Sequence, residues 1–398
     1  MLDTLDLEQV TASILKELEF AKRPVLIFGY GVKLAGAQEV ARSITETLNI
    51  PVCPTWGAID VFPGCVGSFG THGVRAANFA VQNADYILSV GSRLDTKATG
   101  TPASSFAPKA KLVMVDIDPD ELDKMAKIGR LPWRAIRADA KEFLNMLSFW
   151  MRTKSSHDLN AGTFRNPDWD AWRLKVEGWK EKYPPGVQCK GINPYGVMRA
   201  LGKHLNKTDT IVTDTGLSLG WLMQAYPFKG EEFVHALNMT PMGYGLPAAS
   251  GAAWARDRVI CITGDGGLNV NITEFATIFK HEQNVKVIVF NNRAHGMCQQ
   301  TERQWLNGKY CGTSDKDIAT PDFVAIARSY GISAEGFDDD LYRTRLAEFL
   351  CLPGPALMEL RIRAEVGLSP QARFGFPIHD QDPVLDREEI DSVMREAA

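Results

Sequence analysis

Residues 259–266 read VICITGDG, and this stretch decides the fold of the second half of the chain. Its first five residues form a short, almost wholly apolar run, which is typical of a parallel strand covered on both faces. A helix is expected to begin near Asn271, where Glu274 stands three residues later in capping-box-like spacing. Residues 285–290 predict the next strand. Open α/β sheets bind ligands beyond the carboxyl ends of such strands.

Two polar side chains follow these two strands. Asp265 comes directly after the first, Asn292 comes just after the second, and residues 267–290 lie between the two motifs. One carboxylate, one amide oxygen and the flanking Gly264 and Gly266, which let the backbone approach closely, suit a hard cation and a diphosphate. A lone Gly-Asp-Gly is a common turn. The strand–helix–strand context and the paired asparagines favour the functional interpretation.

This pattern resembles the thiamine diphosphate (ThDP) and magnesium motif of the acetohydroxyacid (acetolactate) synthase superfamily. The resemblance implies that Asp265 and Asn292 each give Mg²⁺ a side-chain oxygen and that Ala294 gives its backbone carbonyl. Diphosphate oxygens and water would complete the near-octahedral shell that Mg²⁺ prefers. Gly264, Gly266 and Gly267 would lie against the cofactor.

The composition is typical of a globular protein, and the length of the chain predicts two domains. The chain has 398 residues, of which 45% are hydrophobic and 23% charged. The formal net charge of −4 argues against a nucleic acid or a polybasic membrane contact. Seven cysteines without a Cys-x-x-Cys pair predict neither a disulfide framework nor a zinc site. With no signal-peptide pattern and no apolar run of membrane-spanning length, a cytoplasmic enzyme is expected.

Both halves of the chain alternate apolar strands with amphipathic helices. This alternation of strands and helices predicts an α/β fold with two doubly wound parallel-sheet domains. A stretch rich in proline, glycine, serine and tryptophan interrupts it, and we expect a packed surface helix there. The expected segments are a linker-like 1–22, a central Rossmann-like domain 23–150, a connecting segment 151–190, a ThDP diphosphate- and Mg-binding domain 191–365, and a C-terminal tail 366–398.

The first half carries glycine motifs of its own. They resemble, in order and spacing, the central domain of the acetohydroxyacid synthase large subunit, which in that family cradles FAD in a structural role. The resemblance implies that FAD or ADP could be lined by Gly29, Gly31, His72, Arg93 and Asp116. Arg93 could pair with phosphate, and Asp116 could accept ribose or adenine hydrogen bonds. Alternatively, the domain keeps its fold without a nucleotide, and His72 is a structural histidine.

A second glycine turn follows the predicted strand that ends near Thr213. The Gly216 N–H group and the Ser218 hydroxyl suit the distal phosphate of a cofactor at a helix N-terminus. The synthases carry Gln-His-Gln where this chain has residues 217–219, Leu-Ser-Leu. An ordinary helix N-cap at Ser218 is an equally good interpretation of this segment alone.

Further cofactor contacts are implied by the resemblance alone. Met242, followed by Gly243, matches the apolar wedge that bends ThDP in the family, a packing role that suits a flexible thioether. His295 and Met297 match the turn on the substrate side. The synthases carry a tryptophan where this chain has Thr301, so the preference for a larger acceptor ketoacid is not carried over.

The resemblance covers residues 8–365 and leaves out the family's N-terminal pyrimidine-binding domain. That domain supplies the glutamate that activates the cofactor, a contribution typically worth about 10²–10⁴-fold. No glutamate here matches its motif, so no catalytic residue is assigned, and the activating glutamate is expected on a partner chain.

The sequence therefore predicts one subunit of a split ThDP-dependent, acetolactate-synthase-like transferase. The complex would decarboxylate a 2-ketoacid, with pyruvate expected, and transfer the acyl carbanion equivalent to a carbonyl acceptor. A separate pyrimidine-binding subunit and a homodimer or higher oligomer are expected. Two alternatives stay open: a non-catalytic nucleotide-binding or regulatory subunit, and a simple ThDP-dependent decarboxylase or lyase.

Overall fold

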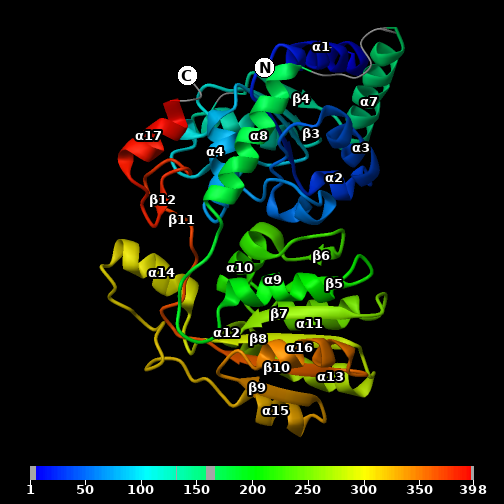
Figure 1. The fold of residues 1–398 in the computed structure, drawn as a ribbon. Coiled ribbons are helices and arrows are strands. Elements are labelled where there is room, and N and C mark those ends of the chain that lie inside the picture. Colours follow the sequence, from blue (N-terminus) through cyan, green and yellow to red (C-terminus); the bar gives the residue numbers. More distant parts are fainter. Residues whose placement is uncertain (1–5, 131, 158–165, 396–398) are drawn as a thin grey trace. The chain divides into compact units, whose positions relative to one another are not determined.

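The computed structural model describes residues 6–130, 132–157 and 166–395 (Figure 1). The chain forms two compact units. The first unit comprises Met1–Pro184 and Pro370–Ala398, and the second comprises Pro185–Ser369. Most of the segment expected to be a C-terminal tail thus belongs to the first unit. Among the described residues, no helix has both the length and the apolar character needed to cross a membrane.

The first unit is built on a parallel sheet. Its strands, in spatial order, are β1 (Pro24–Phe28), β2 (Tyr86–Val90), β3 (Lys111–Asp116) and β4 (Arg134–Arg137). On the free edge of β1, Leu26 forms an isolated parallel bridge with Val52. The chain therefore passes to one side of β1 before it returns to build β2 on the other side. This reversal makes the sheet doubly wound, as predicted.

Helices cover both faces of this sheet because successive residues of each strand point to opposite faces. Along β1, Leu26 and Phe28 enter one hydrophobic core and Val25 and Ile27 enter the other. The first core contains side chains of α1 (Leu7–Glu19), α3 (Gln38–Leu48) and α7 (Ala140–His157), and the second contains those of α4 (Arg75–Asn83), α6 (Pro119–Lys127) and α8 (Pro167–Lys182). The smaller elements are α2 (Gly31–Leu34), η1 (Trp56–Val61), α5 (Thr96–Thr99), η2 (Ala103–Ser105), β11 (Gln371–Ala372), β12 (Gln381–Asp382) and α17 (Arg387–Arg395).

The expected linker-like segment and the expected connecting segment both contribute helices to the cores of the first unit. Helix α1, within the expected linker-like segment, buries Val10, Ile14 and Leu18. Helix α8, within the connecting segment, buries three tryptophans. The indole N–H groups of Trp169 and Trp172 donate to the carbonyls of Ala21 and Pro24, at 2.8 and 3.1 Å. Residues 1–5 and 158–165 of these segments lie outside the described part of the chain.

The second unit contains a six-stranded parallel sheet in the order β6-β5-β7-β8-β10-β9. After β5 the chain first adds β6 on one side and later adds β7 on the other, so the strand order reverses at β5. Figure 1 shows β5, β7 and β8 as neighbours. The strands are β5 (Thr210–Thr213), β6 (Glu232–Val234), β7 (Val259–Gly264), β8 (Val285–Asn291), β9 (Ser333–Phe337) and β10 (Ala356–Arg361).

Helices again cover both faces of the sheet. Val285, Val287 and Val289 of β8 share one core with helices on their face, whereas Phe290 packs against Trp221 of α10 with ring centroids 5.3 Å apart. The elements are α9 (Pro194–His204), α10 (Leu217–Ala225), η3 (Leu237–Met239), α11 (Gly245–Ala252), α12 (Asp265–Val270), η4 (Ile272–Glu274), α13 (Phe275–Lys280), α14 (Gly296–Trp305), α15 (Phe323–Ser329) and α16 (Tyr342–Cys351).

The two strands predicted around the Gly-Asp-Gly turn are confirmed as β7 and β8. The predicted helix start near Asn271 is confirmed in part, because a 3₁₀ turn with Asn271 as its N-cap residue leads into α13. The sequence interpretation missed a separate helix, α12, which begins at Asp265. The Asn271 side chain makes no capping bond and instead donates to the Gly243 carbonyl at 2.8 Å. Asp265 therefore lies in the first turn of a helix, where the N–H groups are free to meet a ligand.

Candidate functional site

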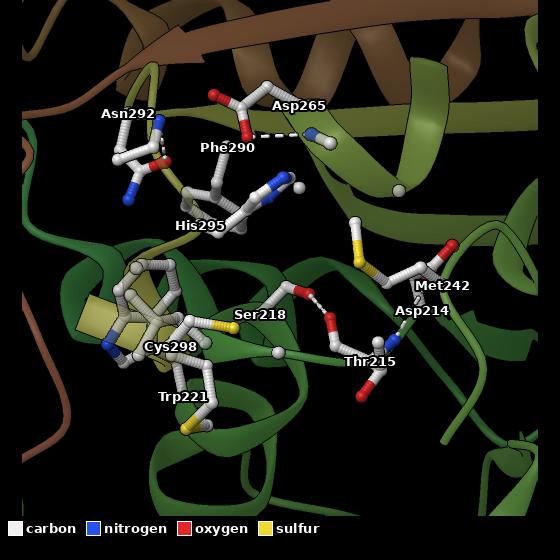
Figure 2. A pocket seen from close by; sticks show the side chains of 18 of the residues that line it. Asp214, Thr215, Ser218, Trp221, Met242, Asp265, Phe290, Asn292, His295 and Cys298 are labelled. Carbon is white, nitrogen blue, oxygen red and sulfur yellow. Dashed lines mark hydrogen bonds between the residues drawn. The ribbon is translucent and has the colours of Figure 1, made fainter. Parts of the chain in front are cut away.

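A cavity of about 270 Å³ opens at the carboxyl edge of the second sheet (Figure 2). It lies where β5 and β7 adjoin, which is the switch point at which doubly wound sheets bind ligands. The register places Thr213 beside Ile262 and Gly264 beside Phe290, so the loops after β5, β7 and β8 leave the sheet at a similar level. The cavity is lined by Asp214, Thr215, Gly216, Leu217, Ser218, Trp221, Thr240, Met242, Gly264, Asp265, Gly266, Gly267, Phe290, Asn292, Ala294, His295, Gly296, Met297 and Cys298.

Among the described residues that line the cavity, the carboxylate of Asp265 contains a buried oxygen without a hydrogen-bond partner. Its side chain is 6% exposed, and Oδ1 accepts from the N–H of Gly266 at 2.7 Å. Oδ2 is buried and has no hydrogen-bond partner among the described residues. Burial raises the pKa of Asp265, and the hydrogen bond from the N–H of Gly266 offsets part of this effect. A buried acceptor without a partner costs about 1–3 kcal/mol, so a cation in the cavity would satisfy it.

Asn292 and Ala294 bring further oxygen atoms to the cavity. Asn292 is 7% exposed, and its Oδ1 accepts from the N–H of Ala294 at 3.2 Å. A Cβ on Gly296 would lie 2.7 Å from Asn292 Nδ2, so this glycine lets the amide lie close to the start of α14. Among the described residues, no group of three or more His, Cys, Asp or Glu side chains could hold a metal. A donor set of one carboxylate, one amide and a backbone carbonyl suits Mg²⁺ better than Zn²⁺.

Gly216 and Ser218 line the cavity at the start of α10. Gly216 is the N-cap residue with φ +93°, a backbone conformation that favours glycine. The alternative that Ser218 is the N-cap is therefore wrong. Ser218 is 2% exposed, and its hydroxyl donates to the Thr215 carbonyl at 3.3 Å. Both residues therefore lie at the N-terminus of α10, and the Ser218 hydroxyl proton is already used within the turn.

Met242, His295 and Gly266 meet on one wall. A Cβ on Gly266 would lie 2.8 Å from His295 Cε1 and 3.1 Å from Met242 Cε. The missing side chain therefore lets both residues approach the backbone of α12. Gly264, Gly267 and Met297 also line the cavity. Thr301 lies one turn further along α14, where its hydroxyl donates to the Met297 carbonyl at 3.2 Å.

Of the residues predicted to bind the cofactor, only Gly243 is not among the described residues that line the cavity. Its N–H donates to Asp214, and its carbonyl accepts from Asn271. The sequence interpretation missed Asp214, although it follows a buried strand as Asp265 does. It also missed the apolar wall formed by Leu217, Trp221 and Phe290, because apolar residues near strand ends are not distinguished from core residues by sequence alone.

The residues of the first unit that were predicted to bind a nucleotide contact other residues of the protein. A Cβ on Gly29 would lie 2.1 Å from the Gly91 carbonyl oxygen, and one on Gly31 would lie 2.7 Å from Gly91 Cα. These glycines therefore let the loops after β1 and β2 touch. The guanidinium of Arg93 pairs with Glu121 at 2.9 Å. A nucleotide phosphate would have to compete with Glu121 for Arg93.

His72 and Asp116 also have interaction partners within the protein. The His72 ring lies 5.6 Å from the Trp56 ring, and a ring nitrogen is 3.1 Å from the Thr71 hydroxyl. Burial, with a smaller contribution from Lys97, lowers the pKa of His72 to about 4, which keeps its imidazole neutral at physiological pH. The Asp116 carboxylate accepts from the N–H of Asp118 at 3.1 Å, and burial raises its pKa.

Two family models match this chain. Residues 214–360 match the C-terminal TPP-binding domain of thiamine pyrophosphate enzymes, and residues 11–147 match the central domain of the same enzymes. The chain therefore belongs to the thiamine pyrophosphate enzyme family, as the Gly-Asp-Gly motif predicted.

Its relatives include acetolactate synthases. The chain is 32% identical over 355 residues to the acetolactate synthase large subunit of Cyanidium caldarium, covering 86% of this chain and 58% of that protein. It is 32% identical over 361 residues to the acetolactate synthase isozyme 1 large subunit of Escherichia coli, covering 88% and 60%. It is 34% identical over 357 residues to a probable chloroplastic acetolactate synthase of rice, covering 85% and 52%. The chain thus spans between about half and 60% of the length of these relatives.

Proposed function

We propose that this chain holds the magnesium and diphosphate half of the ThDP site of an acetolactate-synthase-like enzyme. The observation that supports the proposal most strongly is the buried, unpartnered Oδ2 of Asp265 on the wall of a cavity at the sheet switch point. Asp265, Asn292 and the Ala294 carbonyl would bind the metal. Gly216 and Ser218 would meet the distal phosphate at the N-terminus of α10.

The charge of the cavity supports the proposed need for a metal. Its described lining contains two carboxylates, Asp214 and Asp265, and no lysine or arginine. These side chains alone cannot neutralise a diphosphate. A divalent cation held by Asp265 and Asn292 would supply the missing positive charge.

The remaining lining residues would shape the reacting end of the site. Leu217, Trp221 and Phe290 contribute apolar side chains to the lining, and these would keep water from a bound ligand. Met242 and His295, brought close by Gly266, would set the conformation of a bound ligand. When bound, the cofactor supplies the carbanion chemistry that decarboxylation of a 2-ketoacid requires. We propose pyruvate as the donor and an aldehyde or ketone as the acceptor.

The activating carboxylate would come from a different polypeptide. No glutamate is among the described residues that line the cavity. A pyrimidine-binding domain on a separate chain would supply it, and two or more copies of each chain would assemble. The family resemblance supports the assignment of the carboxylate to this domain, because in that family the activating glutamate belongs to the pyrimidine-binding domain.

Co-purification from the native host tests the split enzyme. We expect mass spectrometry to identify a co-purifying polypeptide with a pyrimidine-binding domain, together with ThDP. The reconstituted complex should consume pyruvate at a rate at least about 100-fold above that of this chain alone, the lower bound of a general acid–base contribution.

Three results would contradict the proposal in distinct ways. A native polypeptide that carries both domains in one chain would exclude a separate subunit. A bound adenine nucleotide without ThDP would favour a nucleotide-binding regulatory subunit. Release of an aldehyde with no carboligation, for every acceptor offered, would favour a simple decarboxylase.

A further inference from the structure

We propose that Asp214 is a positioning residue of this site, whose buried carboxylate fixes the turn that carries Met242. The inference rests on the function proposed above and adds a residue to it. Asp214 would not contact the reacting atoms. It would act through the backbone of residues 243–245 and through the start of helix α12.

The carboxylate of Asp214 is bound by three backbone N–H groups. Asp214 directly follows β5 and is 1% exposed. Oδ1 accepts from Thr215 at 2.8 Å and from Gly243 at 3.2 Å, and Oδ2 accepts from Gly245 at 3.0 Å. Hydrogen bonds to an ionised acceptor are roughly twice as strong as neutral ones. One side chain therefore ties the end of β5 to the turn after Met242.

The same turn is held from its other side. Gly243 has φ +84°, and its carbonyl accepts from Asn271 Nδ2 at 2.8 Å. A Cβ on Gly243 would lie 2.7 Å from Val270 Cγ1 and 2.9 Å from Asn271 Nδ2. Because both hydrogen-bonding groups of Gly243 are engaged, the two peptide groups on either side of its Cα are each held by a side chain.

Asp214 also packs on the helix that begins with Asp265. A Cβ on Gly267 would lie 2.8 Å from Asp214 Cγ and 2.9 Å from Oδ2, so no side chain fits between the carboxylate and α12. On the same helix, a Cβ on Gly266 would lie 3.1 Å from Met242 Cε. Asp214 therefore contacts both elements whose separation determines the position of Met242 relative to the proposed metal site.

A positioning role predicts a loss of turnover that exceeds the loss of binding. In Asp214→Asn the amide nitrogen cannot accept a hydrogen bond, so at least one of the three N–H groups loses its acceptor. Metal and diphosphate binding, which depend on Asp265 and Asn292, would change little. Misplacement by about 1 Å can cost about 100-fold in rate.

The experiment compares Asp214→Asn with Asp209→Asn in the full chain and in the complex with its partner. Asp209 is a matched control, because it is a 2% exposed carboxylate at the other end of β5 that binds Arg258 at 2.6 Å. For Asp214→Asn we expect kcat to fall by about 100-fold and the ThDP affinity with Mg²⁺ to fall by less than about 10-fold. Hydrogen exchange measured by mass spectrometry should accelerate in residues 241–247. Asp209→Asn should lower thermal stability without this change in kcat.

A second variant displaces the carboxylate without removing its charge. Gly267→Ala is expected to reproduce the loss of kcat, because the new methyl group would occupy the space of the Asp214 carboxylate. The proposal is overturned if Asp214→Asn retains the wild-type kcat. It is also overturned if both aspartate variants lose kcat and ThDP affinity in parallel, which indicates general destabilisation. If the wild-type chain itself binds no ThDP while exchange still accelerates in Asp214→Asn, the proposed function fails and the role of Asp214 is structural only.

Discussion

Replacing Asp265 with alanine is expected to abolish the Mg²⁺-dependent binding of ThDP. The substitution removes the one carboxylate of the proposed metal site, including the oxygen that has no partner among the described residues. Loss of groups that merely support a metal ligand already costs about 10–100-fold in affinity, so loss of the ligand itself should cost more than about 100-fold. Isothermal calorimetry of ThDP at a fixed Mg²⁺ concentration measures the effect.

Two controls separate the loss of a ligand from the loss of the fold. Asp257→Ala changes an exposed carboxylate of the same unit and should leave ThDP affinity unchanged. In the absence of metal, Asp265→Ala should unfold at a temperature no lower than the wild type, because burial raises the pKa of this carboxyl and Oδ2 is unsatisfied. Undiminished ThDP affinity in a folded Asp265→Ala protein would contradict the metal assignment.

Truncation of Met242 to alanine is expected to reduce turnover by about 100-fold, the size of effect that a misplacement of about 1 Å produces. The thioether lines the cavity and would lie 3.1 Å from a Cβ on Gly266, so its loss enlarges the cavity next to α12. Met242 makes no proposed contact with the metal or the diphosphate. We therefore expect ThDP affinity to change by much less than kcat, measured on the complex with its partner.

Met239→Ala provides the matched control for this prediction. Met239 belongs to the same connection but is 85% exposed and is not among the residues that line the cavity. Its truncation should leave both kcat and ThDP affinity at wild-type values. Equal losses in Met242→Ala and Met239→Ala would show that the connection as a whole, rather than the wedge, determines turnover.

The strands and the loops that carry Asp265 and Asn292 could be predicted because their signals are local. Residues 259–262 are all apolar, residues 285–290 are apolar except for Lys286, and parallel neighbours end at the same edge of a sheet. These two facts place Asp265 and Asn292 in the lining of the same cavity. Most predicted cofactor residues of the second half also line it, because they follow neighbouring strands.

The contacts that could not be predicted join residues distant in sequence. Asn271 looked like a helix cap, but its amide binds Gly243, 28 residues earlier. The donors to Asp214 lie up to 31 residues away. Arg93 looked free for a phosphate, yet Glu121 of α6 pairs with it. In each case a long-range hydrogen bond or ion pair outweighs the local pattern.

The most direct measurement is a calorimetric titration of the wild-type chain with ThDP, first with Mg²⁺ and then with excess EDTA. With two lining carboxylates and no lysine or arginine among the described residues of the cavity, binding should require the metal. We expect saturable binding of ThDP with Mg²⁺ and no measurable heat of binding with EDTA. Equal affinity in both conditions, or no binding with Mg²⁺ even in the presence of the partner chain, would contradict it.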